Sequence, residues 1–204
     1  MPVQEQPVPD LFFEKVQAPG EIFLAQNPLP SGKDFSKHAY WRAIIPDLYD
    51  AYRGICAYSC HWTPYDTGWK TVEHFKPKSK YPQDAYRWDN YRFVCGILNG
   101  CKGNHEDVLD PFTLKEGTFE MDFPSLQLRP GESLSAAEIK RVKSTIKWLK
   151  LNSDTCIRGR KHWLLAYLKG YPVEYLEENA PFLALELKRQ KLVSREAEMW
   201  REFI

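Results

Sequence analysis

The sequence has no apolar run long enough to cross a membrane and no large excess of charge of either sign. No stretch approaches the roughly 20 apolar residues of a membrane span, and the N-terminal residues lack the basic start and apolar stretch of a signal peptide. We therefore expect a cytoplasmic protein. The net charge is +1, from 28 basic and 27 acidic residues. A protein that coats nucleic acid is usually more basic, so any such contact should be local.

Cysteine is scarce, and its five positions are odd in number and unevenly spaced. In a cytoplasmic chain such cysteines favour metal ligands or buried thiols over disulfides. A nucleotide-binding P-loop of the G-x-x-x-x-G-K-[ST] kind is also missing, so any regulation by ATP must come from another chain. By contrast, hydrophobic residues make up 43% of the chain and aromatic residues 14%, which predicts a packed core.

The patterning predicts an α+β protein in three regions. Residues 1–54 form an N-terminal extended segment and helix, residues 55–125 a region of short strands with an acidic loop, and residues 126–204 a helical region. Prolines throughout residues 1–35 predict extended or loop structure there. Residues 37–53 follow a helical pattern that contains a proline, which predicts a kink or two shorter helices.

The central region holds short runs rich in aromatic and β-branched residues, separated by proline, glycine and aspartate. These runs predict strands at 55–62, 71–75 and 91–95, and the GILNGCKGN stretch at 96–104 predicts a short helix.

The C-terminal region is predicted to be helical throughout. Its clearest helix begins at Ser135, because Ser135 followed by Glu138 fits a capping box. Further helices are expected at 157–169, 173–179 and 181–203. The last of these is amphipathic, and it either packs on its own domain or docks a partner.

The residues that could carry chemistry lie between Thr71 and Asn104. Hydrolysis of a phosphodiester needs a base for water and positive charge beside the phosphate, and histidine with a divalent cation can supply both. Glu73 and His74 are neighbours on a predicted strand, so their side chains point to opposite faces unless the strand ends there. Asn90 is expected on a second short strand after Trp88 and Asn99 on the short helix, so a hairpin followed by a helix would bring these side chains to one small cleft.

This arrangement resembles the signature of the HNH nucleases. The motif consists of Glu73-His74, Asn90 and Asn99-x-x-Lys102, with asparagine in place of the last histidine. The surrounding EHFKPKSKYP, WDN, C-x-x-x-N-x-x-K-G and LDP stretches resemble the HNH component of Septu-type and retron-associated antiphage defence systems. The resemblance covers about half of the chain.

The resemblance implies a small ββα-metal core embedded in a mainly helical domain, and a single-metal endonuclease acting on DNA or RNA. His74 would be the general base, and Asn90 would orient it by holding its imidazole or the surrounding loop. Glu73 and Asn99 would hold Mg²⁺, which Mn²⁺ could replace. The resemblance also implies an ATPase partner of the ABC or SMC type.

Local charge agrees with a phosphate-binding segment. From position 70 to position 102 the chain carries seven basic and three acidic residues. Such a segment within a neutral protein can hold a phosphate backbone. The residues predicted to contact nucleic acid are Lys76, Lys78, Lys80 and Lys102.

The chain departs from the family's pattern where relatives carry a zinc ribbon. Ser59 and Leu98 stand in place of one cysteine of each C-x-x-C pair, so a structural zinc site of the usual spacing is not expected. Two alternatives stay open, a rearranged zinc site and buried thiols with aromatic packing in place of zinc. The rearranged site would use Cys56, Cys60, Cys95 and Cys101. The aromatic candidates are Trp62, Trp69 and Phe93.

Loss of the zinc pairs also leaves a second function open. The chain could be a catalytically inactive, HNH-shaped module for nucleic-acid binding or assembly, whereas retention of His74, Asn90 and Asn99 favours the enzyme. A third alternative is a homing or restriction enzyme that acts without a partner.

Overall fold

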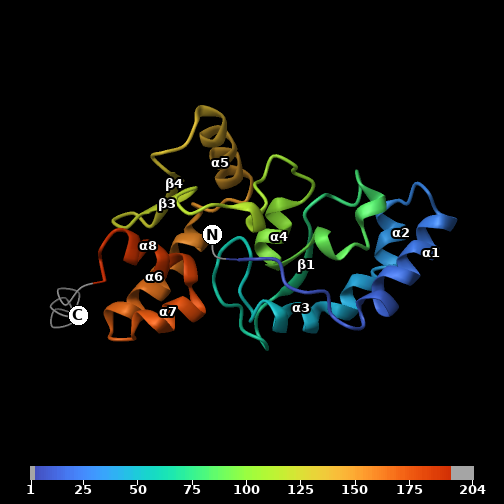
Figure 1. The fold of residues 1–204 in the computed structure, drawn as a ribbon, viewed down its shortest axis with the longest axis horizontal. Coiled ribbons are helices and arrows are strands. Elements are labelled where there is room, and N and C mark those ends of the chain that lie inside the picture. The colour runs from blue at the N-terminus through green and yellow to red at the C-terminus, as the bar shows by residue number, and fades with distance from the viewer. Residues whose placement is uncertain (1–2, 194–204) are drawn as a thin grey trace. The chain divides into compact units, whose positions relative to one another are not determined.

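A computed structural model describes residues 3–193 and shows a mixed α+β fold (Figure 1), about 49% helical with two small antiparallel sheets. The chain forms two compact units. The first, which we call the hairpin unit, comprises Gln4–Ala57 and Thr63–Glu106. The second, the helical unit, comprises Val3, Tyr58–Trp62 and the chain from Asp107 onward. The α+β prediction is confirmed.

The extended or loop structure predicted for residues 1–35 is found in positions 3–11 and 27–31, but helices occupy positions 12–26 and 32–37. A π-helical turn, η1 (Phe13–Gln17), leads directly into α1 (Ala18–Gln26), and α2 (Gly32–Lys37) follows. The prolines do not prevent these helices, because Pro19 lies in the first turn of α1, where its missing N–H has no helical partner to lose. Ser31 closes a capping box at the start of α2.

The two shorter helices predicted around Pro46 are confirmed. A 3₁₀ turn, η2 (Tyr40–Ile44), is followed by α3 (Ile45–Ala51), and Pro46 lies in the first turn of α3. Beyond this helix the chain turns at Gly54, whose φ of +70° suits glycine.

The centre of the hairpin unit is an antiparallel pair of strands followed at once by a helix. Strand β1 (Lys70–His74) pairs with β2 (Tyr91–Cys95), and α4 (Gly96–Lys102) starts at the next residue. The strands predicted at 71–75 and 91–95 and the short helix after them are therefore confirmed. The loop between the strands contains the 3₁₀ turns η3 (Pro82–Asp84) and η4 (Trp88–Asn90). No strand of residues 55–62 is found in the described chain.

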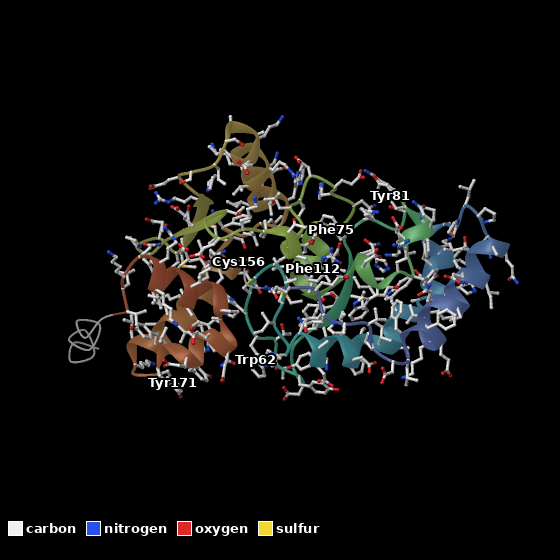
Figure 2. All side chains as sticks on the ribbon, viewed as in Figure 1. Trp62, Phe75, Tyr81, Phe112, Cys156 and Tyr171 are labelled. Carbon is white, nitrogen blue, oxygen red and sulfur yellow. The ribbon has the colours of Figure 1, made fainter. Side chains whose placement is uncertain are left out.

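Aromatic side chains form much of the core of the hairpin unit. Phe12 meets Trp88 and Tyr91 edge-on, with ring centroids 5.6 and 5.9 Å apart. Phe93 is fully buried, as expected of an aromatic core residue. Trp62, which is labelled in Figure 2, is 39% exposed, and Trp69 is 69% exposed, so neither of these two candidates is buried in the core in place of zinc.

The helical unit combines a second hairpin with four helices. Its elements are η5 (Pro111–Thr113), β3 (Phe119–Asp122), β4 (Gln127–Pro130), α5 (Ala136–Trp148), α6 (Asp154–Leu168), α7 (Val173–Asn179) and α8 (Pro181–Arg189). The capping box at Ser135 is confirmed at the start of α5. The predicted acidic loop, residues 103–125, lies mostly in this unit, which takes in the chain from Asp107. Within it, Leu109 N donates to Thr145 Oγ1 of α5 at 2.9 Å.

Helix α8 packs on its own unit. Its buried Glu186 accepts a hydrogen bond from Met121 N of β3 at 2.8 Å, and Gln190 donates to Met121 O at 2.7 Å. Of the helix predicted at 181–203, the described part is α8, and it packs on β3 of its own unit. Positions 194–204 lie outside the described residues. Between residues 3 and 193 no helix is both long and apolar enough to cross a membrane.

Acid should weaken the helical unit through His61. Burial, the charge of Arg160 and the neighbouring His162 together lower the pKa of His61 to about 3. The unfolded chain binds the proton near pH 6.5, so stability is lost as the pH falls below that value. Between pH 7 and pH 5 we expect a loss of about 2 kcal/mol. Hydrogen exchange of the α6 amides, corrected for intrinsic rates, measures it.

The matched variants are His61→Gln and His162→Gln. The first should remove most of this pH dependence, whereas the second alters an exposed neighbour and should leave it in place. A His61→Gln protein with the full pH dependence would contradict the assignment.

Candidate active site

A cleft of about 570 Å³ opens in the hairpin unit beside β1. Its lining includes the six consecutive residues from Trp69 to His74, and residues of the following loop and of α4. Glu73, His74 and Asn99, which the sequence places together, all line this cleft. Glu73 and His74 can both do so because β1 ends at His74. Asn90 lies behind it and does not line it.

His74 is held in one orientation at the end of β1. Its Nε2 lies 2.9 Å from the carbonyl oxygen of Ala85, and its ring meets Trp41 and Tyr91 edge-on at 4.7 and 5.1 Å. A carbonyl oxygen can only accept, so Nε2 carries the proton and donates it. The other ring nitrogen, Nδ1, therefore keeps its lone pair and can accept a proton.

The charge state of His74 follows from its burial. The side chain is 6% exposed, and burial lowers its pKa to about 3, with the nearby ammonium of Lys78 acting in the same direction. The ring is therefore neutral throughout the physiological pH range. A neutral imidazole is the form that a general base requires.

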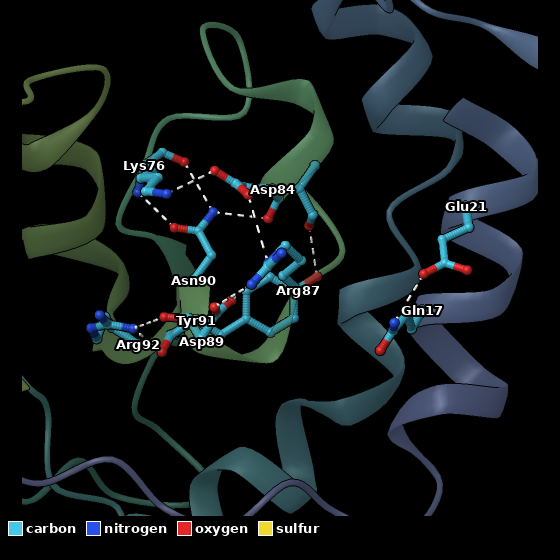
Figure 3. A network of polar contacts seen from close by, with 10 residues as sticks. Gln17, Glu21, Lys76, Asp84, Arg87, Asp89, Asn90, Tyr91 and Arg92 are labelled. Atoms are coloured by element: carbon cyan, nitrogen blue, oxygen red, sulfur yellow. Dashed lines mark hydrogen bonds and ion pairs between the residues drawn. The ribbon is translucent and has the colours of Figure 1, made fainter. Parts of the chain in front are cut away.

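Asn90 holds the loop that carries Ala85. Its Oδ1 accepts from Lys76 N at 2.7 Å, and its Nδ2 donates to Lys76 O at 3.1 Å and to Asp84 O at 3.0 Å (Figure 3). These bonds tie the two ends of the loop together next to Ala85, whose carbonyl oxygen accepts the hydrogen bond from His74 Nε2. Of the two roles anticipated for Asn90, the contacts correspond to holding the loop and not to touching the imidazole.

Side chains reinforce the same loop. Tyr91 donates its hydroxyl to Ala85 O at 2.8 Å, and Lys76 pairs with Asp84 at 3.0 Å. Lys80 pairs with Glu106. Lys76 and Lys80 are two of the four lysines predicted to contact nucleic acid. Both are exposed, and both already form ion pairs with acidic residues.

Lys102 is fully buried. Its ammonium lies 2.8 Å from Glu73 Oε1 and donates to the carbonyl oxygens of His74 at 3.0 Å and Phe75 at 2.7 Å. Two of its three donor positions thus serve backbone carbonyl oxygens, and the Glu73 carboxylate pairs with its charge. The predicted phosphate contact of Lys102 is therefore wrong, because this lysine joins α4 to the end of β1 in the interior.

Glu73 is a buried carboxylate with an incompletely satisfied oxygen. Its Oε1 forms an ion pair with the Lys102 ammonium at 2.8 Å but accepts no hydrogen bond among the described residues. Burial raises the pKa of Glu73 to about 7, while the charge of Lys102 opposes the rise. Near neutral pH the group is close to half-ionised, so a further cation at this carboxylate would be stabilised.

Asn99 offers an amide oxygen to the same cleft. Its Nδ2 donates to Thr71 Oγ1 at 2.8 Å and to Val72 O at 3.2 Å, which fixes the orientation of the amide. Within residues 3–193 no group donates to its Oδ1. The Glu73 carboxylate and this oxygen are hard ligands of the kind that Mg²⁺ takes in small number beside water, so the residues present fit such an ion.

The cleft is basic for reasons that the sequence shows only in part. Three basic residues, Arg42, Lys70 and Lys78, line it against the single carboxylate of Glu73. Lys78 is half-buried, and its ammonium lies 5.3 Å from the centre of the Trp41 ring. Sequence reasoning missed Arg42, which lies in η2 far upstream and outside any motif.

The cysteines are divided between the two units. Cys60 belongs to the helical unit, whereas Cys56, Cys95 and Cys101 belong to the hairpin unit. Cys56 is fully buried and accepts a hydrogen bond from Cys95 N at 3.3 Å. In the described part of the chain no group of three or more His, Cys, Asp or Glu residues is arranged to hold a metal ion.

Comparison with known proteins adds no assignment. No family model matches the chain, and the search of curated proteins found no match.

Removal of the Lys102 ammonium should destabilise the hairpin unit. Lys102→Met leaves Glu73 and two carbonyl oxygens buried without their donor, which should cost about 3 kcal/mol. Hydrogen exchange of the β1 and β2 amides reports the loss. Adding Glu73→Gln to the variant should restore part of it.

The matched control is Lys78→Met. This lysine is half-buried and has no ion pair among the described residues, so the change should cost less than about 1 kcal/mol. Equal losses in the two variants would show that Lys102 has no special structural role.

Proposed function

We propose that this chain is a metal-dependent HNH endonuclease, with β1, β2 and α4 forming its ββα-metal core. One observation carries the proposal. His74 Nε2 donates a hydrogen bond to Ala85 O, which leaves Nδ1 as an acceptor, and His74 lines a basic cleft. A phosphodiester fits such a cleft because the surrounding cations attract it and the base can activate water beside it.

The protein's own residues would carry the proton transfer. His74 Nδ1 takes a proton from water, and the Ala85 carbonyl then stabilises the imidazolium through the Nε2 hydrogen bond. Trp41 and Tyr91 prevent the ring from turning, and Asn90 prevents the loop from moving away. Lys78 and Arg42 attract the phosphate.

Glu73 and Asn99 would hold the divalent cation, Mg²⁺ or Mn²⁺. A bound cation would offset charge on the phosphate and on the departing 3′ oxygen. A structural zinc ion forms no part of the proposal.

The motif around the site supports a more specific role. Its resemblance to the HNH component of Septu-type and retron-associated systems leads us to propose a nuclease effector subunit of an antiphage defence complex. An ABC or SMC-type ATPase would be the partner, since the chain carries no P-loop of its own.

One observation favours the inactive, nucleic-acid-binding or assembly module instead. The Lys102 ammonium lies 2.8 Å from Glu73 Oε1, so the carboxylate proposed as a metal ligand already has a cation beside it. If this pair never opens to a cation, the hairpin keeps its shape without activity. Cleavage assays separate the two functions.

The test is cleavage of plasmid DNA and of tRNA with Mg²⁺, by the full chain together with any partners that co-purify with it. His74→Ala should lower the rate at least about 100-fold, because general bases contribute about 10²–10⁴. His105→Ala is the matched control, since this histidine belongs to the same unit but does not line the cleft. Equal inertness of wild type and His74→Ala, with partners and metal present, would support the inactive module.

Metal binding should strengthen as the pH rises through 7. Glu73, whose pKa is raised to about 7, must lose its proton to act as a ligand, so the apparent Kd should fall by up to about tenfold per pH unit below pH 7 and level off above it. His74 is already neutral in this range and adds no dependence. Mn²⁺ binding followed by electron paramagnetic resonance between pH 5.5 and 8.5 measures this. A Kd independent of pH, or unchanged in Glu73→Gln, would exclude Glu73 as a ligand.

A further inference from the structure

Trp69 lines the cleft and is exposed to an extent unusual for tryptophan. The residue directly precedes β1, and its side chain is 69% exposed. A large indole ring left in water at the wall of a cleft has apolar surface to bury, so such residues often mark a contact with a ligand.

The indole is held in place although it is exposed. Gly96 N donates to Trp69 O at 2.8 Å, and the ring lies directly against Gly96, where a Cβ atom would come within 2.0 Å of ring atom Cδ2. Only glycine permits this approach. The indole is therefore supported by the backbone at the start of α4 and presents its remaining surface to the cleft.

The charges beside Trp69 identify the class of ligand. Arg42, Lys70 and Lys78 line the same cleft, and the Lys70 ammonium is fixed by a 2.7 Å hydrogen bond to Tyr65 O. A ligand that suits this wall combines repeated negative charge with flat π surfaces. Nucleic acid with an unstacked base has both, because its phosphates meet the cations while its base stacks on the ring.

We propose that Trp69 is a stacking platform for an unpaired nucleobase, so that the substrate entering this cleft is single-stranded or locally unpaired nucleic acid. Bases inside a duplex have both faces covered by their neighbours, and a protein ring reaches them only after they are unstacked or flipped out. This inference names the substrate class of the proposed nuclease site and rests on that function, but it can be tested separately.

The position of Trp69 sets where the stacked base lies relative to the cut. His74 lies five positions after Trp69 along an extended strand, which corresponds to about 17 Å at about 3.3 Å per residue. At about 3.4 Å per stacked nucleotide this distance spans about five nucleotides, and fewer if the strand is stretched. The stacked base is therefore not next to the scissile phosphate, and very short oligonucleotides should not reach it.

The experiment measures binding without cleavage, in the full-length His74→Ala protein. The probes are fluorescein-labelled single strands of DNA and RNA of 3 to 12 nucleotides and the matching duplexes, with affinity read by anisotropy. Trp69→Ala should weaken binding of the longer single strands about 5- to 150-fold, as expected for one stacked base. Trp69→Phe should retain most of the affinity. Duplex affinity and the affinity of the shortest strands should not change.

Trp62→Ala is the matched control, because this tryptophan is also exposed and does not line the cleft. Gly96→Ala keeps the indole but displaces it, so it should weaken single-strand binding in the same direction as Trp69→Ala. The inference is overturned if Trp69→Ala binds long single strands as tightly as its parent, in which case the exposed indole would suit a protein partner. It is also overturned if Trp69→Ala loses duplex affinity to the same extent, because the contact would then not depend on an unpaired base.

The two proposals fail in different ways. Binding that depends on Trp69 without any cleavage by the wild-type protein removes the nuclease and leaves the platform. Cleavage that depends on His74, together with binding indifferent to Trp69, removes the platform and leaves the nuclease.

Discussion

The buried ammonium of Lys102 is the contact on which the geometry of the cleft depends. It reaches from α4 to Glu73 and to the carbonyl oxygens of His74 and Phe75, and so attaches the helix to the last residues of β1. A buried cation is costly unless it is paired and hydrogen-bonded, and this one has one ion pair and two hydrogen bonds. Because Asn99 lies on the same helix, this attachment also places its amide oxygen on the same cleft as Glu73 and His74.

A second constraint comes from the side chain of Asn90 acting on the backbone of the loop. Asn90 ties Lys76 to Asp84, and the neighbouring Ala85 carbonyl selects the protonated nitrogen of His74. Asn90 and Ala85 do not themselves line the cleft. A change at Asn90 would act on the imidazole indirectly, through the loop. Loss of activity in such a variant would therefore not show that Asn90 contacts the substrate.

The cleft combines these groups with positive charge and one exposed ring. Its cations come from η2, from β1 and from the loop after β1, so no single segment of the chain accounts for them. Trp69 adds a π surface at the far end of the strand from His74. Such a surface can distinguish unpaired from paired bases, which phosphate contacts alone cannot do.

Much of the local structure could be predicted from the sequence. The β-branched and aromatic runs predicted β1 and β2, the following stretch predicted α4, and the pairing of Ser135 with Glu138 predicted the start of α5. The N-terminal helices were missed because a proline in a helix's first turn looks in sequence like any other proline.

The sequence by itself determined which side chains with chemistry lie near the hairpin and the helix, since spacing along a strand or a helix depends on neighbouring residues. Only the tertiary structure decided which of them face solvent. Lys102, which was predicted to contact phosphate, is buried, and Trp69, which was a candidate for packing in place of zinc, is exposed. Burial depends on contacts between residues far apart in the chain, here Lys102 with Glu73 and Trp69 with Gly96, and no local pattern records such contacts.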